Sequence, residues 1–155
     1  MKTFLKFTAL SAVLLMLAVG LASCNERENP VEVPFTIFSI AETSCHWVNL
    51  TYDNNVVIIN SNIELQNYIY CSDSDFPEID FSKYTLLLAS GMTFHGPVVK
   101  ISKCLLQVTT NEYRLDITVL YGDLTAPDIW NTALVIPKIS DNCQIKLNVT
   151  MHNVW

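Results

Sequence analysis

The sequence is poor in glycine and in basic residues, and both shortages exclude whole classes of function. Only four glycines occur in 155 residues, so there is no glycine-rich loop to cradle a phosphate. The sequence also lacks a G-x-S-x-G elbow, a C-x-x-C pair and an H-E-x-x-H motif. Nine Lys and Arg stand against fifteen Asp and Glu, whereas nucleic-acid binding needs clustered positive charge. We therefore expect no nucleic-acid partner, no cofactor and no enzymatic activity.

The N-terminus carries a short apolar run with the features of a secretory signal peptide. Lys2 and Lys6 precede residues 7–20, which read FTALSAVLLMLAVG. The run is shorter than the roughly 20 apolar residues that a spanning helix needs. It ends in Leu21-Ala22-Ser23-Cys24, which resembles the lipobox of bacterial lipoproteins.

The lipobox resemblance implies where the protein is cut and where it lives. Cleavage would remove a signal peptide of residues 1–23, and Cys24 would carry a diacylglyceryl group on its thiol and an acyl chain such as palmitate on its amine. Several acyl chains anchor a protein stably to a membrane. Asn25, rather than Asp, follows Cys24, so the enterobacterial inner-membrane retention signal is absent. We expect a lipid-anchored protein of the outer membrane or cell surface of a Gram-negative bacterium.

Residues 24–33 allow two interpretations. They include Glu26, Arg27 and Glu28 and then Pro30, which is typical of a solvated tether. Acidic residues after the lipid-bearing cysteine also resemble the surface-export signal of Bacteroidetes lipoproteins, although Arg27 interrupts that pattern. We expect one β-rich domain over residues 34–155. Losing Lys2 and Lys6 leaves seven basic residues against fifteen acidic ones, so the mature charge is −8.

Most of the domain has the periodicity of β-strands. The continuous apolar run at 83–90 predicts a central strand covered on both faces. Residues 113–121 alternate apolar and polar side chains, which indicates a half-exposed antiparallel strand. Residues 143–151 alternate in the same way, with one apolar and one polar face. A change of the apolar face near Ser102–Lys103 predicts a β-bulge, and we expect a loop at 91–97 and a turn at 122–131. Further strands are expected at 34–40, 44–50, 56–60, 98–108 and 132–138.

One segment has helical rather than strand periodicity. Ser61 and Glu64 form the pattern of a capping box at the start of residues 61–70. Leu65, Tyr68 and Ile69 then share one helical face. The expected fold is therefore α+β and mostly β: a small antiparallel sheet or barrel-like domain with one short helix.

Four cysteines remain after Cys24, namely Cys45, Cys71, Cys104 and Cys143. An exported protein can hold two disulfides. Cys104 and Cys143 both fall on strand faces assigned to the core, which favours a Cys104–Cys143 pair and leaves Cys45–Cys71. Free buried cysteines are the alternative.

Other candidate chemistry is weak. Asp73, Asp75, Glu78 and Asp80 supply oxygen ligands that suit Ca²⁺, but a solvated acidic loop explains them better, and Asp80 can instead cap the turn into the next strand. The three histidines, His46, His95 and His152, are scattered, and we expect no metal site.

Cys45 and Trp130 are two further residues whose side chains could serve a function. Cys45 adjoins His46, but neighbours on a strand point to opposite faces, so a catalytic pair is not expected. Trp130 stands in the polar turn GDLTAPDIWN, and we expect its ring to be exposed. An exposed Trp130 would favour a glycan-binding protein, because planar rings stack on sugars.

From Val57 onward the chain resembles the C-terminal domain of PrcB-type lipoproteins, which are accessory proteins of a spirochaete surface protease complex. The resemblance rests on IINSNIELQNY (58–68), PEIDFSKYTLLLASG (77–91) and NTALVIPKI (131–139). The family's Gly-Gly-aromatic turn is replaced here by Phe94-His95-Gly96-Pro97. The resemblance implies a small non-enzymatic domain that stabilises or docks another envelope protein.

Overall fold

The protein is described here by a computed structural model that covers residues 29–72 and 76–154. The expected signal peptide, the expected lipid attachment residue Cys24, and Asp73 and Asp75 lie outside these residues.

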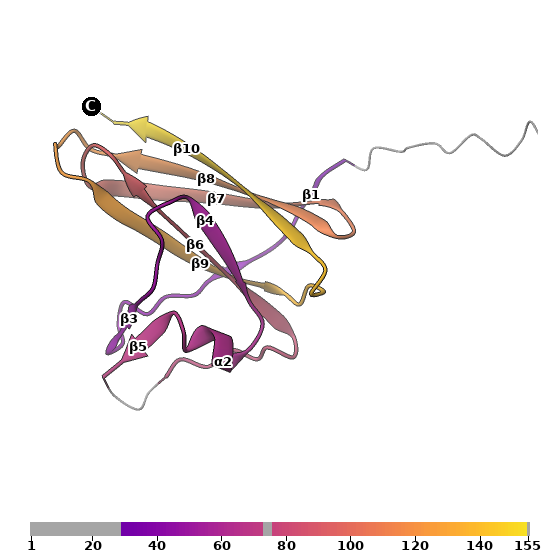
Figure 1. Ribbon diagram of the computed structural model, residues 1–155. Coiled ribbons are helices and arrows are strands. Elements are labelled where there is room, and N and C mark those ends of the chain that lie inside the picture. The colour runs from indigo at the N-terminus through magenta and orange to yellow at the C-terminus, as the bar shows by residue number, and fades with distance from the viewer. Residues whose placement is uncertain (1–28, 73–75, 155) are drawn as a thin grey trace, which may run out of the picture.

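The strands form three layers (Figure 1). The outer sheet has the order β1-β7-β8-β10, and the central sheet has the order β2-β9-β6-β4. The small layer consists of the pair β3-β5 and the helix α2. The outer sheet comprises β1 (Val31–Glu32), β7 (Val98–Thr109), β8 (Glu112–Tyr121) and β10 (Gln144–Asn153). The central sheet comprises β2 (Thr36–Ile37), β9 (Asp128–Pro137), β6 (Tyr84–Thr93) and β4 (Asn55–Ile59), and the small layer comprises β3 (Cys45–Trp47), α2 (Asn62–Leu65) and β5 (Ile69–Cys71).

The central sheet is covered on both faces, as the apolar run at 83–90 predicts. Leu87 of β6 points into the core shared with the outer sheet, where it joins Leu115 and Ile117 of β8. Leu86 and Leu88 point the other way and pack with Leu65 of α2. Alternate residues of one strand therefore belong to two different cores, because side chains alternate between the two faces of a sheet.

Over residues 29–72 and 76–154 the structure confirms a mostly β fold with one short helix, and it corrects one pairing. β8 pairs antiparallel with β7 but parallel with β10, in register from Glu112↔Gln144 to Tyr121↔Asn153. The chain between β8 and β10 passes through β9, which lies in the central sheet. Because a crossing connection of this kind joins parallel strands, the expected antiparallel pairing holds for the other described pairs but not for β8 with β10.

The helix is shorter than the predicted 61–70 segment. Ser61 caps it as expected, since its Oγ accepts a hydrogen bond from the Glu64 N–H at 3.2 Å. The Glu64 carboxylate accepts from the Asn60 N–H at 2.6 Å. The helix ends at Leu65, and Ile69 already belongs to β5, where Tyr70 faces solvent.

Two strands extend into segments expected to be loops. β6 continues to Thr93 and β9 starts at Asp128, because Gly91 and Trp130 pair in register. A Cβ at Gly91 would lie 2.7 Å from the Trp130 ring. The indole thus crosses a position that only glycine leaves open, which explains why a glycine stands inside this strand.

The register of β7 shifts at its two ends and not at Ser102–Lys103. The irregularities lie between Val98 and Lys100 and between Gln107 and Thr109. Leu105 is consequently the core residue, and Cys104 lies on the opposite face of the strand.

Candidate functional site

The cysteines form one disulfide among the described residues. Cys45 and Cys71 face each other in the β3-β5 ladder, with an S–S distance of 2.00 Å and a Cα–Cα distance of 4.0 Å. The expected Cys104–Cys143 pair is wrong, because both cysteines are free. Cys104 pairs in register with Asp116 on the solvent face of the outer sheet, whereas Cys143 is buried. Burial, followed by the charges of Glu32 and Asp116, raises the pKa of the Cys104 thiol.

Trp130 is buried and not exposed. Its side chain is 1 % accessible and belongs to the core between the outer and central sheets. Its Nε1 has no hydrogen-bond partner in the part of the chain that the structure describes. A ring in this position cannot stack on a sugar, so the glycan-binding interpretation loses the residue on which it rested.

Two of the remaining candidate residues, His46 and Asp80, contact neighbouring side chains or backbone groups. The His46 ring lies against Tyr70, with ring centroids 5.2 Å apart. Asp80 pairs with Lys83 at 2.8 Å and accepts from the Ser82 N–H, so it caps the turn before β6. Lys83 and then Ser82 lower the pKa of Asp80 to about 2. Across residues 29–72 and 76–154, no three His, Cys, Asp or Glu side chains gather as a metal site.

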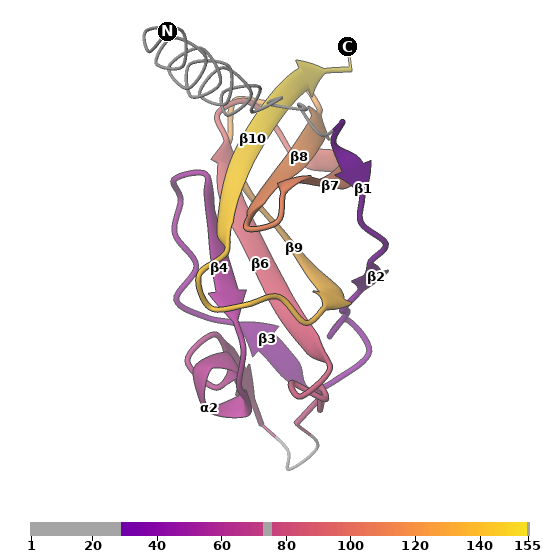
Figure 2. The ribbon, with the colours of Figure 1, turned by 90° about the vertical axis from the view of Figure 1, so that its right-hand side faces the viewer.

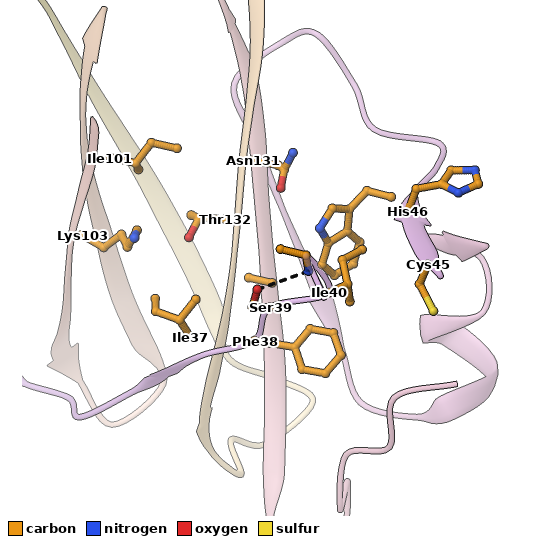
Figure 3. A pocket seen from close by; sticks show the side chains of 13 residues that line it. Ile37, Phe38, Ser39, Ile40, Cys45, His46, Ile101, Lys103, Asn131 and Thr132 are labelled. Carbon is orange, nitrogen blue, oxygen red and sulfur yellow. Dashed lines mark hydrogen bonds between the residues drawn. The ribbon is translucent and has the colours of Figure 1, made fainter. Parts of the chain in front are cut away.

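A hollow of about 480 Å³ opens beside the edge of β9 (Figure 3). We call it the edge hollow. Its walls come from four parts of the chain: β2 with the residues that follow it, β3, β7 and β9. The lining residues are Ile37, Phe38, Ser39, Ile40, Ala41, Cys45, His46, Trp47, Ile101, Lys103, Asn131, Thr132 and Ala133.

The edge hollow exists because β2 is too short to cover β9. β2 pairs only with Leu134 and Val135, and the Phe38 N–H then donates to the Ala133 carbonyl at 2.9 Å. The chain next turns inward to Ile40, which is buried. β1 is equally short and covers only the far end of β7, at Leu106 and Gln107. Figure 2 shows both short strands at one side of the molecule.

The backbone of β9 therefore has an unpaired stretch. The Ala133 carbonyl faces β2, whereas the Lys138 N–H donates to the Lys83 carbonyl just beyond the β6 side. Backbone groups alternate between the two edges of a strand, so Asn131 directs its N–H and C=O away from β6. Within the described residues, no backbone group bonds to Asn131 on that side.

The two sides of this edge differ in chemistry (Figure 3). On the side of the small layer, Phe38 and Trp47 pack as tilted rings with centroids 6.0 Å apart. On the side of the outer sheet lie Ile101 and Lys103 of β7. An extended chain along β9 would send alternate side chains to these two sides.

Lys103 is unusual because it occupies the core-facing side of its strand. It pairs in register with the buried Ile117, and the next residue on the same face is Leu105. The side chain is half-buried. The ion pairs among the described residues are Lys83–Asp80 and Arg114–Asp116, and no acidic residue lines the edge hollow. The hollow thus presents an uncompensated positive charge in a largely apolar setting.

A second uncovered edge belongs to β10 but lacks such walls. The Gln144 N–H donates to the Asn111 carbonyl, so the odd-numbered residues, such as Leu147, direct their backbone away from β8. The polar residues of β10, including Lys146 and Asn148, are exposed. Polar and charged side chains on an edge strand discourage pairing with other chains, so β10 is the weaker candidate.

Sequence reasoning missed the edge hollow because its walls come from segments far apart in the chain. One signal was present: Lys103 interrupts an apolar parity formed by Ile101 and Leu105. The β-bulge predicted near Ser102–Lys103 assigns Lys103 to the solvent-facing side of the strand, and this hid the interruption. Counting Lys103 as core-facing would have singled it out as a functional residue.

Comparisons with protein-family models, curated proteins and solved structures found no match to this chain. The PrcB resemblance therefore has no independent support from them. Within the described residues, no helix has the length and apolar character needed to cross a bilayer.

Proposed function

We propose that this chain is a lipoprotein of the Gram-negative outer membrane or cell surface, anchored through Cys24, whose β-domain binds another envelope protein and catalyses no reaction. The observation that carries the binding role is the uncovered stretch of β9 beside the edge hollow. Unpaired strand edges attract extended chains, and apolar hollows with a few polar groups are typical binding sites.

Two further features support this proposal. The Cys45–Cys71 disulfide suits an oxidising compartment outside the cytoplasm. Exposed apolar side chains also stand on the three strands that contribute to the edge hollow, namely Ile37 of β2, Val99 of β7 and Ile129 of β9. The PrcB-type resemblance adds the expectation of an accessory role beside a surface protein.

Site-specific photo-crosslinking in intact cells tests the binding role. A photoreactive residue at Val99, which is 57 % exposed on β7 two residues before Ile101 of the edge hollow, should capture the same envelope protein repeatedly. The matched control is Ile63 on α2, which is 78 % exposed in the small layer, and it should not capture that protein. A protein that crosslinks to nothing from Val99, and that purifies alone from detergent-solubilised envelope, would contradict the proposal.

A further inference from the structure

We infer that the edge hollow binds an extended acidic peptide segment of a partner protein, which pairs with β9 at Asn131 and places a carboxylate against Lys103. This inference rests on the proposed binding function and deepens it, because it names the binding mode and the chemistry of the partner.

The backbone of β9 provides the first recognition element. Asn131 offers one N–H and one C=O that no described backbone group pairs, in line with the hydrogen bond from Phe38 to Ala133. A peptide strand placed there would continue the position of β2 along β9. Main-chain hydrogen bonds give affinity in this mode, and the pockets on either side give specificity. The Ile129 N–H, the next backbone donor on this edge, already donates to the Asp128 carboxylate, which also accepts from the Val98 N–H of β7. The uncovered part of β9 is therefore centred on Asn131 and has room for about three peptide residues at roughly 3.3 Å each.

The position of the two walls fixes the side-chain pattern of the peptide. The peptide residue that bonds to Asn131 shares the face of the Asn131 side chain, which is the small-layer side. Its side chain would meet Phe38 and Trp47 and should be apolar. The next peptide residue points to the opposite side, toward Ile101 and Lys103.

Lys103 sets the charge of that second residue. The Lys103 side chain is half-buried and has no ion partner among the described residues, so it gains most from a carboxylate, because charge-assisted hydrogen bonds are about twice as strong as neutral ones. Lys100 lies on the same strand and is exposed, but it does not line the edge hollow, so it serves as the matched control. The expected peptide therefore alternates apolar, acidic and apolar side chains.

The unpaired edge of β7 is the less suitable docking strand. The Val33 N–H bonds to the Leu105 carbonyl, so Lys103 and Ile101 also direct backbone groups toward the opening. The solvent face of β7, however, has no second wall comparable to β3. A peptide on β7 would bury side chains on one face only, whereas on β9 it buries them on both.

The test is a titration of defined peptides by fluorescence anisotropy with the full-length protein in detergent micelles. The probe is a seven-residue peptide with an Ile-Glu-Val centre flanked by Ser and Thr. Replacing its Glu by Gln should weaken binding about tenfold. The matched protein variants are Lys103→Met, which keeps the apolar stem, and Lys100→Met on the same strand. Lys103→Met should weaken the Glu peptide and abolish the difference between the Glu and Gln peptides, whereas Lys100→Met should preserve it.

A second probe tests the backbone pairing. Methylating the peptide nitrogen that faces Asn131 should abolish binding, and methylating the next nitrogen should not. The inference is overturned if no peptide of the series binds, or if Lys103→Met leaves the preference for Glu intact. It is also overturned if Lys103→Met only increases self-association of the protein, because Lys103 would then be an inward-pointing charge that protects the edge. Continued crosslinking from Val99 after any of these failures would leave the proposed function standing.

Discussion

The two faces of the central sheet are covered in very different ways. On one face, the outer sheet contributes three strands of ten to twelve residues, β7, β8 and β10. On the other, the small layer contributes two strands of three residues and a helix of four. The small layer is held by a disulfide. The outer and central sheets, which together form a sandwich, have none among the described residues. A layer that buries little apolar area gains little hydrophobic stabilisation, because that stabilisation scales with the apolar area removed from water. A covalent bond such as a disulfide can supply the missing stability.

The difference matters for the binding site, because the edge hollow lies where the two kinds of layer meet. Trp47 and Cys45 of the small layer form one wall, and Lys103 of the sandwich forms the other. We expect a rigid wall on the side of β7 and a wall on the side of β3 whose position depends on the disulfide.

The largest expected effect on stability comes from comparing two single variants, each of which removes one core leucine from a different layer. Leu115 and Leu65 are both fully buried, the first in the sandwich and the second under α2. Leu115→Ala should lower the free energy of global unfolding by about 3–5 kcal/mol, because it removes core contacts and leaves a cavity. Leu65→Ala should instead increase amide exchange mainly in β3, β5 and α2. Urea titration and hydrogen exchange measure the two effects, and equal loss of protection in β8 from both variants would contradict the comparison.

Removing the disulfide is the second test. It closes a segment with a sequence separation of 26 residues, so the variant with both Cys45→Ser and Cys71→Ser should lose about 3 kcal/mol. The loss should appear as faster proteolysis within residues 40–72 and as weaker peptide binding. Cys104→Ser is the matched control, since Cys104 is free, and it should leave both measurements nearly unchanged. Unaltered proteolysis in the double variant would show that the small layer holds itself together.

The crossing of Trp130 over Gly91 predicts an intermediate effect within the sandwich. Gly91→Ala should lower the free energy of unfolding by about 1–3 kcal/mol, because the new Cβ would clash with the mobile end of the Asn54 side chain and would lie 2.7 Å from the more rigid indole. In a Trp130→Leu background the same change should cost less, which a double-mutant cycle measures. An equal cost in both backgrounds would mean that the indole is not the obstacle.

The smallest effect concerns pH and lies at the turn before β6. The pKa of Asp80 is lowered to about 2 by Lys83 and Ser82, below the unfolded value of about 3.9. The stabilisation from its charged form is therefore complete above about pH 4 and is lost as the pH falls through 2. The stability difference between wild type and Asp80→Asn should vanish over this window in urea titrations, and high salt should reduce it because the pair is exposed. A difference that stays constant down to pH 2 would contradict this role.

The sequence predicts where the strands lie better than it predicts which strands pair with each other. Alternation correctly identified β8 and β10, and the run at 83–90 correctly identified a strand covered on both faces. Alternation cannot tell which sheet a strand joins, so the parallel pairing of β8 with β10 was missed. Gly91 and Asp128 looked like loop residues because local composition does not show that Trp130 crosses a glycine on the paired strand.

The candidate site was less predictable than the fold. Cys45–Cys71 followed from elimination, yet the companion pair Cys104–Cys143 was wrong because the face of β7 had been misassigned. The edge hollow depends on how far β2 runs along β9, and no local pattern fixes that length. Lys103 gains its meaning only when its neighbour in the register, Ile117, is known to be buried.

Hydrogen exchange at the Asn131 amide tests the central claim most directly. The exchange is measured by NMR on the full-length protein in micelles, with and without the Ile-Glu-Val peptide. We predict that the Asn131 amide becomes strongly protected on binding, while the Leu147 amide on the free edge of β10 does not change. Protection at Leu147 with none at Asn131 would contradict the assignment of β9 as the docking strand.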